Sequence, residues 1–213
     1  MGKFPGASRY SQFLILWGIV FGLFQGSLAH SMEVIEFLTA GSSTPSIQNN
    51  LDSSLRIQPG FSRGAGVSLA FHISERLDLE TTILYLSRNF SKIEGSGLQT
   101  DYSLALLQYP VLTRYWLSEN FALGMGAYFS NGVGNLTLTQ NSRPRIVGYN
   151  DILLTAWELG LTASAQYQWP LNANMSWVGQ ARFLFGLNNL DQTENGSFYT
   201  RDLQLWCGLG FKL

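Results

Sequence analysis

Side chains of alternating character run through almost the whole chain, and this pattern limits the fold more than any other feature. The last segment, LQLWCGLGFKL at residues 203–213, is apolar at every odd-numbered position and mostly small or polar between them. A period of two is the spacing of a β-strand, whose side chains point to opposite faces in turn. We predict eight such strands, at 33–40, 64–74, 77–90, 100–117, 121–138, 152–169, 175–188 and 199–213.

The connections between these segments alternate in length. SER, SEN and PLNAN are short, whereas residues 41–60, SKIEGSGLQ, QNSRPRIVGYND and LDQTENGSF are long. Successive connections of an antiparallel meander lie at opposite ends, so every short turn falls at one end and every long loop at the other. That asymmetry is typical of outer-membrane barrels, and eight strands allow the last to pair with the first. We therefore predict an all-β fold, an eight-stranded antiparallel up-and-down transmembrane β-barrel.

Residues 1–29 have the plan of a secretory signal peptide. Lys3 and Arg9 precede the apolar run FLILWGIVFGLF, and small residues stand at Ser27 and Ala29, before the expected cleavage site. The run is too short for a membrane-spanning helix, which needs about 20 residues. The expected division is therefore a signal peptide at 1–29 and an outer-membrane β-barrel domain at 30–213. A buried first helix of a soluble domain is the alternative.

Composition agrees with a surface that meets lipid. Charged residues make up 13% of the chain, where ordinary globular domains have about 25%, and aromatic residues reach 14%. The formal net charge is −1, and nothing indicates a nucleic-acid partner. The single cysteine, Cys207, excludes an intramolecular disulfide framework.

The two faces of the predicted strands show which one is outside. Along 152–169 one face is bulky and apolar, from Leu153 to Trp169, and the other is small or polar, from Glu158 to Gln166. An eight-stranded lumen is just wide enough for side chains to fill it, so the small face belongs inside and the apolar wall faces lipid. A soluble, lipocalin-like barrel would instead show Lys and Glu on its polar face. Aromatic residues beside two short turns are predicted to form an interfacial girdle: Tyr115, Trp116, Phe121, Tyr167, Trp169 and Trp177.

Four charged residues interrupt otherwise apolar strands, and all four have the inward parity. They are Glu80, Arg114, Glu158 and Arg182. An arginine on the lipid face near the midplane would cost roughly 2–4 kcal/mol, so we place them in the lumen as a structural charge cluster. Glu80, Arg114 and Arg182 are expected to lie in contact near the short-turn end, because strand tilt can bring them to similar depth.

Two stretches resemble the PorT-like outer-membrane β-barrel family. LLQYPVLTRYWLSENFALGMGAYFS is similar to that family's strand–turn–strand core, and AWELGLTASAQYQWPLNANMSWVGQARFLFGLNNL is similar to a later strand–turn–strand segment. By position, Pro110, Arg114, Glu158 and Arg182 match the family's inward proline, basic, acidic and arginine positions. The resemblance implies the same barrel fold.

The resemblance also bears on the lumen and on assembly. Gln108 and Gln180 stand where the family pattern has Glu, so we expect them to supply neutral acceptors to the arginines. The resemblance implies that the barrel-assembly machinery reads the C-terminal strand. Such strands typically end in an aromatic residue, whereas this chain ends in Leu213, with Phe211 one outward step earlier.

The sequence predicts no catalytic, cofactor-binding or metal-binding residue. His30 lies at the expected cleavage site and His72 lies beside the short SER turn, and with one cysteine they make no transition-metal site. We predict a non-enzymatic barrel, surrounded by outer-membrane lipids, whose long loops meet an unknown extracellular partner. A narrow diffusion pore is the alternative. A further alternative is a lipid-modifying enzyme, which would need its histidine near the outer leaflet, at the end opposite to His72.

Overall fold

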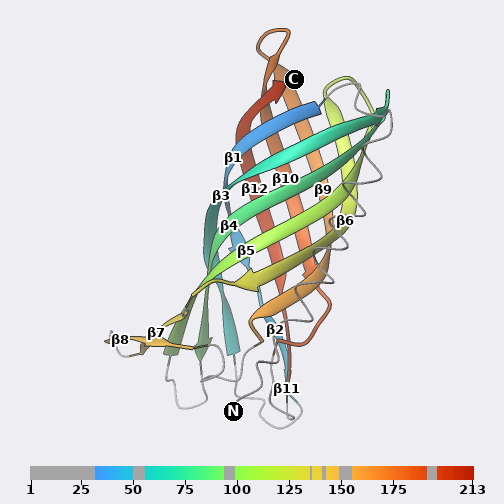
Figure 1. The fold of residues 1–213 in the computed structure, drawn as a ribbon. Helices are drawn as coiled ribbons and strands as arrows, with labels where there is room; N and C mark the ends of the chain where they lie inside the picture. The colour runs from blue at the N-terminus through green and yellow to red at the C-terminus, as the bar shows by residue number, and fades with distance from the viewer. Residues whose placement is uncertain are drawn as a thin grey trace, which may run out of the picture.

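A computed structural model describes residues 32–49, 56–93, 99–134, 136–140, 143–148, 155–190 and 196–213, and the predicted signal peptide lies outside them. No helix in this part of the chain is long and apolar enough to cross a membrane. Eight strands form a tilted barrel (Figure 1): β1 (Met32–Ser43), β3 (Arg56–Ser74), β4 (Leu77–Ile93), β5 (Gln99–Trp116), β6 (Phe121–Gly132), β9 (Trp157–Pro170), β10 (Met175–Gly186) and β12 (Arg201–Lys212).

The barrel closes on itself through its first and last strands. Each of the eight strands pairs antiparallel with both of its neighbours, and β12 pairs with β10 on one side and β1 on the other. The β1–β12 register runs from Glu33 opposite Lys212 to Ser43 opposite Asp202, and the Leu213 amide donates to the Met32 carbonyl. The predicted eight-stranded antiparallel barrel is therefore confirmed, and closure leaves no strand of the ring with an unpaired edge.

We expect this closure to give heat-modifiable gel mobility. Unboiled protein in dodecyl sulfate should migrate faster than boiled protein, because a ring of paired strands stays compact until heat breaks the ladder. Leu205→Pro, which removes one ladder donor at the β1–β12 seam, should reduce the fraction of fast-migrating protein. Identical migration of the wild-type protein before and after boiling would contradict a closed barrel.

The loop end carries paired strands that the sequence pattern did not predict. The strand expected at 121–138 stops at Gly132, because the chain turns at Gly134, whose φ of +74° suits glycine. It resumes as the hairpin of β7 (Leu136–Gln140) and β8 (Arg143–Val147), and β7 pairs with β5. The long connection at 41–60 also contains the ends of β1 and β3, together with β2 (Ser46–Asn49), which pairs with β11 (Gly196–Tyr199).

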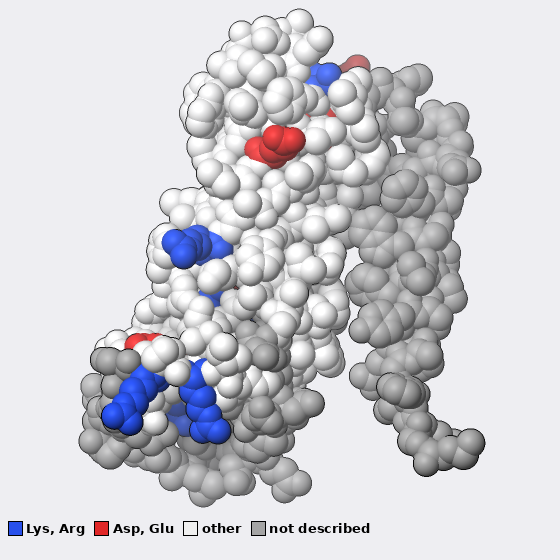
Figure 2. All heavy atoms as spheres, turned by 60° about the vertical axis from the view of Figure 1, so that its left-hand side comes forward, with Lys and Arg blue, Asp and Glu red and all other residues white. Residues whose placement is uncertain are grey.

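The outward side chains form an apolar wall. Along β9 the exposed row begins at Trp157, continues through Leu159 and Leu161, and reaches Trp169. The two tryptophans are twelve residues apart, and about 3.3 Å per residue at a tilt of about 40° makes roughly 30 Å, the thickness of a bilayer's hydrocarbon core. Figure 2 shows one side of this wall as largely uncharged: a few charged groups lie on it, including an acidic one toward the turn end and a basic one at mid-height, and more Lys and Arg side chains lie at the loop end. The bulky apolar face is thus the outer face, as predicted.

Two features of the interior differ from the sequence prediction. Trp116, expected in the girdle, points inward and donates from Nε1 to Asp78 Oδ2 at 2.7 Å, because it has the inward parity of its strand. The lumen also holds large apolar side chains, such as Phe37 and Trp206, whose rings stack 3.7 Å apart. Glycine makes room for them: a Cβ at Gly66 would lie 2.8 Å from the Phe37 ring. The girdle at the turn end includes four exposed residues: Tyr115, Tyr167, Trp169 and Trp177.

Candidate functional site

The lumen is filled, and its charged residues form two groups at different depths. We call them the turn-side cluster (Asp78, Glu80, Arg114 and Arg182) and the loop-side cluster (Arg88, Glu158 and Asp202). Each of these seven residues is at most 3% exposed. They occupy inward positions of β4, β5, β9, β10 and β12, where the period of two places them opposite the lipid-facing row.

Glu80 lies between the two arginines of the turn-side cluster. Its Oε1 is paired with Arg182 Nη2, and its Oε2 lies 3.3 Å from Arg114 Nη1. Ser68 and Thr82 donate hydroxyl hydrogen bonds to Glu80 Oε1 at 3.0 and 3.2 Å. The fold thus brings Glu80, Arg114 and Arg182 together in the lumen, and Glu80 is three residues from the start of β4 at the short-turn end.

Arg114 has further partners that the sequence reasoning missed. Its Nη2 donates to Asp78 Oδ2 at 3.1 Å, and its Nη1 donates to Gln166 Oε1 at 2.6 Å. A guanidinium presents five donors, so two buried arginines need more acceptors than a single carboxylate supplies. With Asp78 included, the turn-side cluster contains two carboxylates and two guanidiniums, which balance in charge.

Arg182 is held by one of the two glutamines expected from the family pattern. Its Nε donates to Gln180 Oε1 at 2.7 Å, and its guanidinium carbon lies 3.6 Å from the centroid of the Trp206 ring, a cation–π contact. Gln108 does not reach either arginine. Its Nε2 donates instead to Ser130 Oγ at 3.0 Å, at a level nearer the loops.

Glu158, which the sequence places in one lumen charge cluster with Glu80, Arg114 and Arg182, lies apart from those three residues, in the loop-side cluster. Arg88 bridges the two carboxylates there, with Nη1 2.7 Å from Glu158 Oε2 and Nη2 2.5 Å from Asp202 Oδ2. The Tyr128 hydroxyl donates to Glu158 Oε1 at 2.6 Å, and Thr200 donates to the same oxygen. The loop-side cluster contains two carboxylates and one guanidinium. The hydroxyls of Tyr128 and Thr200 supply further donors to Glu158.

A parity rule applied to every strand would have found the missed residues. Asp78 and Arg88 lie on the same face of β4 as Glu80, and Asp202 lies on the inward face of β12. The sequence does not single them out, because each stands toward a strand end, and polar residues are also expected in the turns and loops that follow. Their position relative to one another depends on how the strands are staggered, which no single strand reveals.

Beyond the loop-side cluster, apolar side chains fill the mouth of the barrel. Phe90 stacks on Tyr102 with ring centroids 4.9 Å apart, and the Phe90 and Phe198 ring centroids lie 5.5 Å apart, with Phe198 on β11. Leu136 and Val147 of the β7–β8 hairpin are buried in the same group. The connections at the loop end therefore cover the lumen with an apolar layer.

At the short-turn end the lumen opens into a recess of about 540 Å³, whose lining includes His72, Glu119 and Lys212. His72 Nδ1 lies 2.6 Å from Asp78 Oδ1. A His–Asp pair can support nucleophilic catalysis when a hydroxyl or thiol bonds to the second ring nitrogen, but no described serine, threonine or cysteine hydrogen bonds to this ring. The described residues also contain no group of three or more His, Cys, Asp or Glu side chains placed to hold a metal ion.

Several solved structures are similar to this chain. The fold is similar to that of the outer membrane protein OprG from Pseudomonas aeruginosa, with a TM-score of 0.60 at 10% identity over 89% of this chain and 98% of that one. Neisserial surface protein A gives a TM-score of 0.49 at 12% identity, with 85% and 97% of the two chains covered. The attachment invasion locus protein Ail of Yersinia pestis gives 0.46 at 12% identity, with 86% and 99% covered.

At the level of sequence, no curated protein matches the chain. A family profile does match, with the description "Outer membrane protein beta-barrel domain", and it spans residues 11–192. A match over most of the chain, together with the closed barrel and its apolar wall, shows the family and the location. The chain belongs to the outer membrane protein beta-barrel domain family and is an integral protein of the Gram-negative outer membrane.

Proposed function

We propose that the protein is a non-enzymatic and non-conducting barrel that serves a structural or interaction role through its extracellular end. The observation that carries this proposal is the set of bonds across the lumen. Arg182 on β10 reaches Glu80 on β4, and these two strands lie on opposite sides of the eight-stranded ring. Arg88, also on β4, reaches across to Glu158 on β9 and Asp202 on β12. Side chains joined across the lumen at two depths argue against a continuous water path.

Purified protein is expected to be silent in planar bilayers. Single-channel recordings should show no conductance steps above those of a mock preparation from cells that lack the protein, because ion pairs and an apolar layer occupy the lumen in series. Correct folding should be verified separately, by the heat-modifiable mobility of protein from the same preparation. Regular steps that scale with protein concentration would refute the proposal and favour the narrow diffusion pore. The open recess at the turn end favours that alternative, because it leaves that end of the barrel open to water.

The extracellular end is the part of the molecule suited to meeting a partner. The β2–β11 pair and the β7–β8 hairpin extend the barrel beyond the wall, as Figure 1 shows, so the loops are presented on paired strands. We also place the chain with the PorT-like group within its family, because two of its strand–turn–strand segments resemble that group. On this proposal the barrel-assembly machinery recognises β12, whose outward row ends in Leu209 and Phe211, directly before Leu213.

A further inference from the structure

A polar groove lies on the outside of the barrel toward the loop end. Its volume is about 450 Å³, and residues of β3, β4, β5 and β7 line it. The polar ones are Asn89, Ser91, Gln99, Asp101, Ser103, Thr137 and Thr139, and Gly60, Phe90 and Tyr102 complete the lining. The Cα register pairs Asn89 with Ser103 and Ser103 with Thr137, so these residues form a row across three adjacent strands. Their parity is that of the lipid-facing row, which makes the groove part of the outer wall and not of the lumen.

The groove begins where the wall changes from apolar to polar. On β4 the outward residues Ile83 and Tyr85 are 55% and 52% exposed, as expected beside lipid chains, and the next outward positions along the strand are Ser87, Asn89 and Ser91. The same change occurs on β5 between Leu107 and Ser103. A change from apolar to polar outward side chains at the same level on neighbouring strands marks the boundary between hydrocarbon and headgroups in the outer leaflet.

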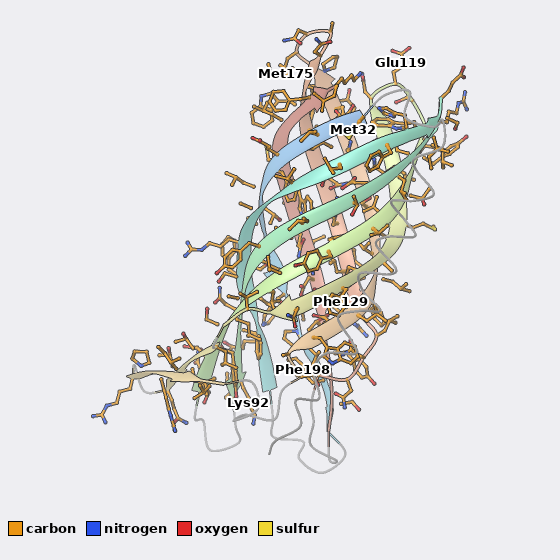
Figure 3. All side chains as sticks on the ribbon, in the orientation of Figure 1. Met32, Lys92, Glu119, Phe129, Met175 and Phe198 are labelled. Carbon is orange, nitrogen blue, oxygen red and sulfur yellow. The ribbon has the colours of Figure 1, made fainter. Side chains whose placement is uncertain are left out.

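The β7–β8 hairpin projects from the barrel beside this boundary. Figure 1 shows the hairpin projecting sideways from the barrel, and its outward face continues that of β5, with Thr137 and Thr139 opposite Ile146 and Pro144. Ile146 is 71% exposed although it is apolar. In Figure 3, Lys92 marks this loop end and Glu119 the opposite end of the barrel. The groove therefore lies between the barrel wall and the β7–β8 hairpin, and apolar side chains are exposed on both sides of it.

We propose that this groove holds the sugar headgroup of an outer-leaflet glycolipid, whose acyl chains lie along the wall below. The lining offers hydroxyls, two side-chain amides and one carboxylate, which are groups that donate to and accept from sugar hydroxyls. Asp101 is held in place by Ser91 Oγ at 2.6 Å and Gln99 Nε2 at 2.8 Å, and both donate to Oδ1. Its second oxygen, Oδ2, is the one that accepts from the ligand. A carboxylate at this point repels phosphate, so the lining favours a neutral sugar over an anionic headgroup.

The test is a competition between two lipids with identical chains. The protein is placed in nanodiscs that contain equal amounts of a diglucosyl diacylglycerol and phosphatidylglycerol, and the lipids retained on it are measured by native mass spectrometry. The wild-type protein should retain the glycolipid about tenfold over the phospholipid, the ratio expected from one or two added hydrogen bonds to a charged or hydroxyl group. Ser103→Trp, which fills the groove, and Asp101→Ala should each abolish the preference.

A matched variant and a soluble competitor complete the design. Glu119→Ala removes an exposed carboxylate at the opposite end and should leave the preference unchanged. Heat-modifiable mobility verifies that each variant is folded. Equal retention of the two lipids by the wild-type protein, or an unchanged preference in Ser103→Trp, would overturn the proposal. A free disaccharide that displaces the glycolipid at equal concentration would assign the groove to soluble sugars and also overturn the assignment to lipid.

Discussion

Replacing Glu80 with glutamine is expected to lower the free energy of unfolding by about 3–5 kcal/mol, the usual cost of leaving a buried charge without its partner. Glu80 is the carboxylate shared by Arg114 and Arg182, and both guanidiniums are fully buried. Water cannot replace the lost charge at that depth. The loss should appear in urea titrations of the protein in lipid vesicles, followed by tryptophan fluorescence and by the fraction that migrates as folded barrel.

Glu119→Gln is the matched control for this prediction. Glu119 is an exposed glutamate in the short turn between β5 and β6, outside the hydrocarbon, so the same change in charge there should alter stability by less than about 0.5 kcal/mol. A double variant, Glu80→Leu with Arg182→Leu, should recover part of the loss, because it removes one orphaned charge together with the carboxylate. Equal losses for Glu80→Gln and Glu119→Gln would show that the turn-side cluster does not stabilise the barrel.

Leu161→Arg is expected to reduce insertion into vesicles, at a cost of about 2–4 kcal/mol. Leu161 is in the middle of the outward row of β9, between Trp157 and Trp169, and is 53% exposed. A guanidinium there would lie near the middle of the hydrocarbon core, where neither water nor a counter-charge reaches it. The insertion equilibrium can be measured by folding from urea into vesicles and scoring the heat-modifiable band.

Leu117→Arg separates the effect of depth from that of exposure. Leu117 is 54% exposed, almost the same as Leu161, but it lies in the short turn after β5, outside the hydrocarbon. Its replacement should cost no more than about 1 kcal/mol, because an arginine at the interface stays in contact with water. If both arginine variants fold equally well, the outer wall assigned here does not face lipid.

The features that the sequence predicts correctly are properties of single strands. The parity of Glu80, Arg114, Glu158 and Arg182 is a local property, since side chains alternate whatever the neighbouring strands do. Strand ends were less predictable. The alternation of 121–138 continues across Gly134, yet the chain leaves the barrel there and forms the β7–β8 hairpin. An isolated glycine within an alternating run looks the same whether the strand continues or turns.

By itself, the sequence determined that this chain is an eight-stranded barrel with its bulky apolar face toward lipid. Strand alternation and loop lengths can be read along the chain, and the cost of a charge in hydrocarbon then assigns the polar face to the lumen. Only the tertiary structure decided which inward residues meet. Glu80 contacts Arg182 from the opposite strand, whereas Glu158, with the same parity and the same charge, contacts Arg88 at another depth. The tilt and stagger of the closed sheet set those depths, and they are properties of the whole ring and not of any single strand.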